Sequence, residues 1–329
     1  MTSLNNTTPV VTPLVKPIIA PIAYQLNALT LAGLTCVNKS SPNNNVTHSN
    51  DNHANANHSN ERIVLCLHGW LDNAASFLPL LEALNKTDLL NTKVIAIDWP
   101  GHGLSEHRSP GAHYHFFDYV YDLLELLEIN QWQKVDVVGH SMGGMIASAF
   151  AAAFPEKVRT LTLIDALGFI CEDESQATQQ LRKGMQARLK NKQAQQRNPI
   201  RYFPLSTAVK ARLLVSDLTE NNATLLVKRG LLETEQGMCW RSDNRLRILS
   251  PYRLTLGQAQ QMMQDIQCPV KLIYADRGIK MVQEHLATAT QLIANFSVTE
   301  LHGGHHIHME KPSEVAKILN EFWSVQHQE

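Results

Sequence analysis

A serine flanked by glycines is the strongest chemical signal in this chain. Residues 138–144 read Val-Gly-His-Ser-Met-Gly-Gly, and Ser141 stands between a strand-like run at 134–138 and a run rich in Ala, Ile and Phe at 145–154. A strand followed directly by a helix places such a serine on a tight turn, called a nucleophile elbow, with little room beside it and a strained backbone. Its hydroxyl is then exposed beside a helix N-terminus, whose amides favour a developing negative charge. The pattern predicts that Ser141 is a nucleophile.

A serine hydroxyl is a weak nucleophile at neutral pH, so it needs a general base. Candidates lie in the His-rich segment 301–310, which follows a predicted strand and precedes the last predicted helix. We expect His305 to be the base, because the two glycines before it give the loop freedom to reach back to the serine. Three neighbouring histidines are alternatives on spacing alone: His302, His306 and His308.

Backbone amides near the serine would stabilise the oxyanion that forms during attack. One expected donor is the amide of Met142, the residue after the nucleophile. The second is the amide of Trp70, which follows a His-Gly pair directly after the predicted strand at 63–67. We interpret His68, in that pair, as a side chain that braces the turn rather than as a catalytic group.

Short apolar runs alternate with helical patterns along the chain, and these elements must position the reactive residues. The predicted strands are continuous apolar runs, as strands buried on both faces should be, at 63–67, 94–97, 135–138, 161–164 and 270–274. Residues 22–37 alternate apolar with small or polar side chains, which predicts a β-hairpin before them. Helical patterns occur at 119–127 and around 315–322. This order favours a mostly parallel sheet covered on both faces.

Three segments depart from this alternation. Residues 1–21 are polar and then punctuated by proline, and we expect a loosely held arm. Residues 38–60 are almost entirely Asn, Ser, His and Thr, which predicts a disordered insert whose histidines form no preorganised metal site. Residues 168–253 are charged and helix-rich, which predicts a helical lid between the two parts of the core, 22–167 and 254–329.

The composition limits the class of protein. The chain has 329 residues and a formal net charge of −1 at pH 7, so its charge does not indicate a nucleic acid or an anionic membrane as partner. Five cysteines occur without Cys-x-x-Cys spacing, which favours reduced thiols and a cytoplasmic location. No apolar run has the length of a membrane span, and the first residues lack the layout of a signal peptide.

Four separated motifs resemble those of the α/β-hydrolase superfamily in order and spacing. They are LCLHGWLDNAASF at 65–77, IDWPGHGLS at 97–105, GHSMGG at 139–144 and GHHIHMEKP at 304–312. The His-Gly-Trp-Leu-Asp-Asn turn and residues 229–246 are similar, more narrowly, to the serine hydrolase-like proteins. The resemblance implies an α/β-hydrolase fold, with a mostly parallel central sheet, flanking helices and a helical lid insertion.

The resemblance also raises the question of which carboxylate orients His305. The superfamily commonly places this acid in a Gly-Asp-x-Asp pattern after a late strand, and that position is Gly278 in this chain. Some members carry the acid at the end of the strand that follows the elbow helix, where this chain has Asp165. We therefore expect Asp165 to be the acid, with Asp276 as the alternative.

Together these residues predict a carboxylesterase-like serine hydrolase that cleaves an ester, thioester or amide of a small carboxylic acid. Ser141 would form the acyl-enzyme, His305 would carry the proton, and Asp165 would hold the imidazole tautomer. The expected partner is a small ester-like molecule, with no cofactor, metal, nucleic acid or membrane insertion; the substrate-binding residues and oligomeric state stay open. Two alternatives are a small-molecule receptor with little turnover, favoured by the missing carboxylate at Gly278, and a carbon–carbon bond hydrolase that uses the same serine and histidine.

Overall fold

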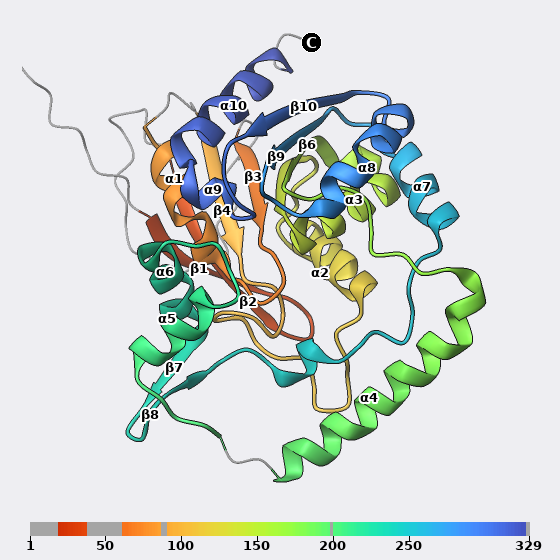
Figure 1. The fold of residues 1–329 in the computed structure, drawn as a ribbon. Coiled ribbons are helices and arrows are strands. Elements are labelled where there is room, and N and C mark those ends of the chain that lie inside the picture. The colour runs from red at the N-terminus through yellow and green to blue at the C-terminus, as the bar shows by residue number, and fades with distance from the viewer. Residues whose placement is uncertain (1–18, 38–60, 87–90, 198–199, 327–329) are drawn as a thin grey trace, which may run out of the picture.

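The computed structural model describes residues 19–37, 61–86, 91–197 and 200–326, and an eight-stranded sheet forms its centre (Figure 1). Its strands are β1 (Ile19–Gln25), β2 (Thr30–Val37), β3 (Arg62–Leu67), β4 (Thr92–Ile97), β5 (Val135–His140), β6 (Val158–Ile164), β9 (Val270–Ala275) and β10 (Phe296–Leu301). They lie in the order β1-β2-β4-β3-β5-β6-β9-β10. From β4 to β10 all neighbours pair in parallel, whereas β2 is antiparallel to both β1 and β4. The predicted mostly parallel sheet is confirmed.

Both faces of the sheet carry a hydrophobic core. Successive side chains of a strand point to opposite faces, so a central strand needs apolar residues throughout. In β3, Leu65 and Leu67 belong to the core on one face, and Val64 and Cys66 to the core on the other. The helices that pack on the first face are α2 (Phe116–Ile129), α3 (Met142–Ala153), α7 (Leu256–Gln264) and α8 (Lys280–Leu292). Those on the second face include α1 (Leu78–Leu84) and α10 (Pro312–Val325), next to the one-turn α9 (Ile307–Glu310).

The segment between β6 and α7, residues 168–253, will be called the lid segment. It contains α4 (Ala177–Arg197), α5 (Leu205–Leu213), α6 (Glu220–Gly230) and an antiparallel hairpin of β7 (Leu231–Thr234) and β8 (Gly237–Trp240). In Figure 1, α4 runs along the edge of the molecule, apart from α5 and α6. Short 3-10 helices complete the described elements, at Ala74–Phe77, Pro155–Lys157, Glu174–Gln176 and Asn244–Arg247. The structure thus adds a hairpin to the helices that the sequence predicted here.

The N-terminal hairpin begins earlier than the sequence indicated. β1 starts at Ile19, inside the segment predicted as a loose arm, and pairs with β2 from Ile19 opposite Cys36. The rest of the predicted arm and the whole predicted insert at 38–60, with its histidines, lie outside the described residues. No helix in the described part of the chain combines the length and apolar character needed to cross a membrane.

Candidate active site

Ser141 lies on the turn that joins β5 to α3. Its backbone has φ 52° and ψ −121°, a left-handed conformation that is strained for a residue with a side chain, at a cost of about 1–3 kcal/mol. Two flanking glycines permit this turn. A Cβ on Gly143 would lie 2.5 Å from the carbonyl carbon of Leu67, and a Cβ on Gly139 would lie 2.6 Å from the Cα of Gly144. The tight turn predicted from the glycine spacing is therefore present.

The loop after β3 lies directly against this turn. A Cβ on Gly69 would be 3.1 Å from the Cβ of Ser141, so the Gly69–Trp70 peptide is beside the serine. Met142 is the first residue of α3, and the first amides of a helix have no acceptor within the helix. Both residues predicted to donate to an oxyanion are thus at the elbow. The Trp70 indole itself points to the lid segment, where its Nε1 donates to the Leu246 carbonyl at 3.1 Å.

His68 braces this loop, as its position after β3 indicated. Its ring is fully buried, and its Nε2 accepts a hydrogen bond from the Trp99 amide at 2.9 Å, which leaves Nδ1–H to donate to the Gly69 carbonyl at 2.7 Å. Burial lowers the pKa of His68 to about 4, so the ring is neutral near pH 7. A neutral ring with both nitrogens engaged serves to fix the loop.

His305 and Asp165 form a hydrogen-bonded pair, and the His305 ring is centred 4.5 Å from that of His140, the residue before Ser141. The Nδ1 of His305 is 2.6 Å from Oδ2 of Asp165, although 140 residues separate them in sequence. Asp165 follows β6 and is fully buried, and its carboxylate accepts hydrogen bonds from the amides of Ala275 at 3.2 Å and Ile279 at 2.9 Å. These bonds compensate the burial of the charge and hold the carboxylate in one orientation.

Asp276, the alternative acid, is engaged elsewhere. Its carboxylate accepts from Nδ1 of His302 at 2.7 Å and from the Gly303 amide at 2.9 Å, and the His302 side chain is largely exposed. The structure therefore brings Asp165, and not Asp276, to His305.

Gly278 explains why the acid is found at 165. A Cβ at position 278 would lie 2.5 Å from Oδ2 of Asp165 and closer still to Oδ1. The Asp165 carboxylate occupies the space that a side chain at 278 would need. The missing carboxylate at 278 and the presence of one at 165 are thus two aspects of a single arrangement.

The comparisons with known proteins agree with this fold. Residues 62–312 match the model of a family described as the alpha/beta hydrolase fold. The chain belongs to the α/β-hydrolase family. It is 30% identical over 278 residues to a serine hydrolase-like protein of Danio rerio, covering 79% of this chain and 81% of that protein. It is also 30% identical over 281 residues to the serine hydrolase-like protein 2 of Homo sapiens, covering 80% and 87% of the two chains.

Solved structures extend the comparison to three dimensions. A hypothetical protein, PA1622, from Pseudomonas aeruginosa PAO1 superposes with a TM-score of 0.77 at 30% identity, covering 94% of this chain and 100% of that chain. A thioesterase domain from the curacin biosynthetic pathway shares the fold, with a TM-score of 0.72 at 23% identity and coverage of 92% and 99%. This chain is therefore an α/β hydrolase of the serine hydrolase-like branch.

The histidines that compete with His305 on spacing have other environments in this hydrolase. His302 is the exposed partner of Asp276, and His308 is fully buried with its ring 5.0 Å from that of Phe77. His306 is buried, and its Nε2 lies 3.1 Å from Oδ2 of Asp72. Of the four histidines, His305 is the one that pairs with Asp165.

A charged network surrounds His306, and the sequence pattern did not indicate it. Burial alone would lower the pKa of His306, but the carboxylates of Asp72 and Asp217 raise it to about 9. Asp217 also accepts the backbone amide of His305 at 2.6 Å, and Nη2 of Arg212 lies 2.5 Å from Oδ1 of Asp72. Arg212 and Asp217 come from the lid segment, so the lid segment is tied to the loop that carries His305. The sequence does show Asp72 in the HGWLD motif, but its spacing does not indicate which residues Asp72 contacts.

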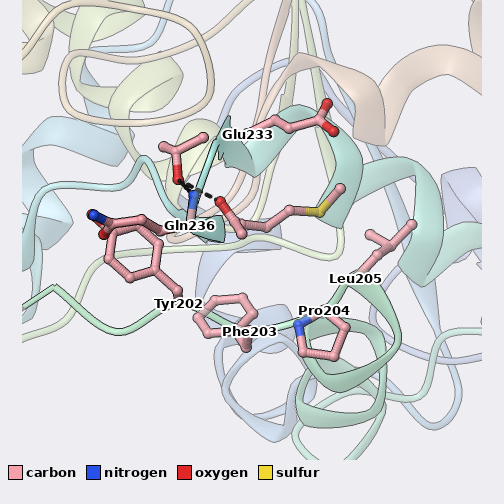
Figure 2. Close-up of a pocket in the computed structure, with 9 residues that line it drawn as sticks. Tyr202, Phe203, Pro204, Leu205, Glu233 and Gln236 are labelled. Carbon is pink, nitrogen blue, oxygen red and sulfur yellow. Dashed lines mark hydrogen bonds between the residues drawn. The ribbon is translucent and has the colours of Figure 1, made fainter.

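A surface cavity of about 520 Å³ lies within the lid segment (Figure 2). It is lined by residues 202–205 and by the β7–β8 hairpin, with Tyr202 and Phe203 on one side and Glu233 on the other. None of its lining residues belongs to the predicted site, so this cavity is separate from Ser141 and His305.

Proposed function

We propose that this hydrolase cleaves an ester, thioester or amide of a small carboxylic acid by means of Ser141, His305 and Asp165. The observation that carries the proposal is the 2.6 Å contact between Nδ1 of His305 and the buried Asp165 carboxylate. The His305 ring is centred 4.5 Å from that of His140, which directly precedes Ser141 on its strained turn. A carboxylate only accepts, so Nδ1 carries the proton and the lone pair is on Nε2. That is the tautomer a general base for serine requires.

The chemistry then follows in two steps. Nε2 of His305 takes the proton of the Ser141 hydroxyl as Oγ attacks the substrate carbonyl, and returns it to the leaving group when the tetrahedral intermediate collapses. In the second step, His305 takes a proton from water as the water attacks the carbonyl of the acyl-enzyme, and returns it to Oγ of Ser141 as the carboxylic acid leaves. The amides of Met142 and Trp70 are the proposed donors to the oxyanion, and one such donor is worth about 10²–10³ in turnover.

The receptor alternative loses its main support. It depended on the missing carboxylate at Gly278, and Asp165 supplies a carboxylate to His305 from elsewhere. Carbon–carbon bond hydrolysis uses the same serine and histidine and is distinguished by substrate. A reducing compartment, such as the cytoplasm, is part of the proposal, because all five cysteines are free.

Labelling with a fluorophosphonate probe tests the nucleophile. We expect about one probe per chain on Ser141 and none on the Ser141→Ala variant, with circular dichroism showing that the variant is folded. Labelling that persists in Ser141→Ala, or its absence from the wild-type protein, would contradict the proposal. A panel of acyl esters, thioesters and amides, with a vinylogous diketone for carbon–carbon cleavage, then identifies the reaction.

A further inference from the structure

A buried cluster of metal-ligand side chains adjoins the proposed base and has no part in the proposed mechanism. Asp72 lies in the loop after β3, His140 is the last residue of β5, and His306 follows His305. All three are buried, and one ligand atom from each lies within 4.8 Å of the other two. Oδ2 of Asp72 is 3.1 Å from Nε2 of His306 and 3.7 Å from Nδ1 of His140.

The tautomer of His140 leaves a lone pair pointing into this cluster. Its Nε2 is 3.0 Å from the carbonyl oxygen of His305, and since a carbonyl only accepts, Nε2 carries the proton. Nδ1 is then the basic nitrogen, and it has no hydrogen-bond partner among the described residues. It faces Oδ2 of Asp72, which already accepts a hydrogen bond from Nε2 of His306. A metal ion among these three atoms would take the place of that proton and also satisfy the lone pair on Nδ1 of His140.

Each histidine has the outer partner that is typical of a metal ligand. A ligating imidazole usually donates its other N–H to a carbonyl or carboxylate, which fixes the ring and makes it more basic. His140 does so to the carbonyl of His305, and Nδ1 of His306 lies 3.4 Å from the carboxylate of Asp217. Residue 69 is glycine, and a side chain there would crowd two of the ligand atoms: a Cβ would lie 3.1 Å from Nδ1 of His140 and 3.3 Å from Oδ2 of Asp72.

The spacing fits a tetrahedral ion. Ligand atoms about 2.0–2.1 Å from such an ion are about 3.3 Å apart. The two distances from Oδ2 of Asp72 are close to this, at 3.1 and 3.7 Å, and the ligand atoms of His140 and His306 lie within 4.8 Å of each other. We propose that Asp72, His140 and His306 bind Zn²⁺ or a similar transition-metal ion through Oδ2, Nδ1 and Nε2, with a fourth position open. Two imidazoles and one carboxylate suit such an ion better than Mg²⁺ or Ca²⁺, which prefer oxygen ligands.

The Arg212 side chain would compete with the metal ion for Asp72 and His306. Its Nη2 lies 2.5 Å from Oδ1 of Asp72 and 3.2 Å from Nε2 of His306, so its guanidinium supplies the positive charge that the ion would supply. The ion and Arg212 are therefore alternatives, and binding of the ion releases this contact between α5 and the β3 loop. The ion would also hold His140, whose Nε2 positions the backbone of His305.

Zinc binding is measured best in a protein that cannot react. The starting protein is the full chain with Ser141→Ala, and with His48, His53 and His58 replaced by Gln so that the 38–60 segment supplies no imidazole. Titration with ZnCl₂ alone in a calorimeter should give about one ion per chain, and Co²⁺ in its place should give the intense visible absorption of tetrahedral cobalt. Because binding is read without turnover, the result is independent of the proposed reaction.

Substitutions then locate the site. His140→Gln and His306→Gln should each weaken Zn²⁺ binding by about a hundredfold or more, whereas Arg212→Gln should strengthen it about tenfold by removing the competing charge. The matched control is His302→Gln, which removes an exposed histidine from the same loop and should leave the affinity unchanged. If circular dichroism shows that one of these histidine variants is unfolded, Asp72→Asn is measured in its place. The site is refuted if neither the starting protein nor its Arg212→Gln form binds Zn²⁺, or if the ligand variants bind it as tightly as the starting protein.

Discussion

Replacing Gly278 by alanine should inactivate this hydrolase, although the new methyl group is not placed to touch a substrate. The three atoms nearest to a Cβ at 278 all belong to the carboxyl group of Asp165, and the distance to Oδ2 would be 2.5 Å. Ordinary van der Waals contact begins at 3.4 Å, so the two groups must separate by about 1 Å. Asp165 is fully buried and bound by the amides of Ala275 and Ile279, so it cannot retreat without losing these bonds.

The size of the effect follows from what the displaced carboxylate does. A misplacement of about 1 Å at an active site costs about 10² in rate, and loss of the triad acid in a serine protease costs about 10⁴. We expect kcat/KM of Gly278→Ala to fall between these limits. The fall should be mainly in kcat, because the His305–Asp165 contact matters most when the imidazole becomes charged.

A double-mutant cycle separates this cause from general damage. In an Asp165→Ala background the carboxylate is gone, so Gly278→Ala should add less than about threefold to the loss. The assay is hydrolysis of an activated ester or, where turnover is slow, the rate of fluorophosphonate labelling of Ser141, with unfolding curves for all variants. The reasoning is wrong if Gly278→Ala stays within about fivefold of the wild-type protein, or if the two losses multiply.

Three further perturbations test the surroundings of the site. Asp276→Ala should change kcat/KM by less than about threefold, because this carboxylate binds the exposed His302; a loss near that of Asp165→Ala would contradict this. The hydrogen bond from His306 lowers the pKa of Asp217 to about 2, so its stabilising effect is complete above about pH 4 and is lost as the pH falls towards 2. Since Asp217 is 40% exposed, urea unfolding should show Asp217→Asn less stable by about 1 kcal/mol at pH 6 and by less at pH 3; an equal gap at both would argue against it. Cys66 is fully buried, which raises its thiol pKa, so a thiol reagent should modify it only after unfolding, as mass spectrometry of the labelled peptides would show.

The central sheet could be predicted from the sequence because its strands are short, apolar and buried on both faces. The run at 63–67 falls within β3, and that at 135–138 within β5. The elbow could be predicted for a similar reason, since only glycine fits where Gly143 approaches the carbonyl of Leu67. In both cases the structure depends on local sequence: apolar residues indicate a strand buried on both faces, and glycines indicate a close approach of the backbone.

Pairings between distant loops could not be predicted in this way. The His305–Asp165 contact joins positions 140 residues apart, and spacing alone left three other histidines as alternatives. The β7–β8 hairpin was also missed, because its strands have four residues each and lie in a charged segment. The ligand cluster of Asp72, His140 and His306 comes from the end of β5 and from two loops that follow strands, which meet at one end of the same sheet.

The position of the acid in the sequence can change while the requirement for a carboxylate at His305 stays the same. The requirement is a buried carboxylate on Nδ1 of His305, and it is met from the end of β6 rather than from the loop after β9. Side chains at positions 165 and 278 would occupy the same space, because a Cβ at 278 would overlap the Asp165 carboxyl group. The loop after β9 therefore has to present a glycine at 278 and donate the Ile279 amide to Asp165 instead of supplying an acid. A transfer of the acid back to 278 would need both changes at once, Asp165 shortened and Gly278 replaced, since either one alone leaves His305 without a correctly placed carboxylate.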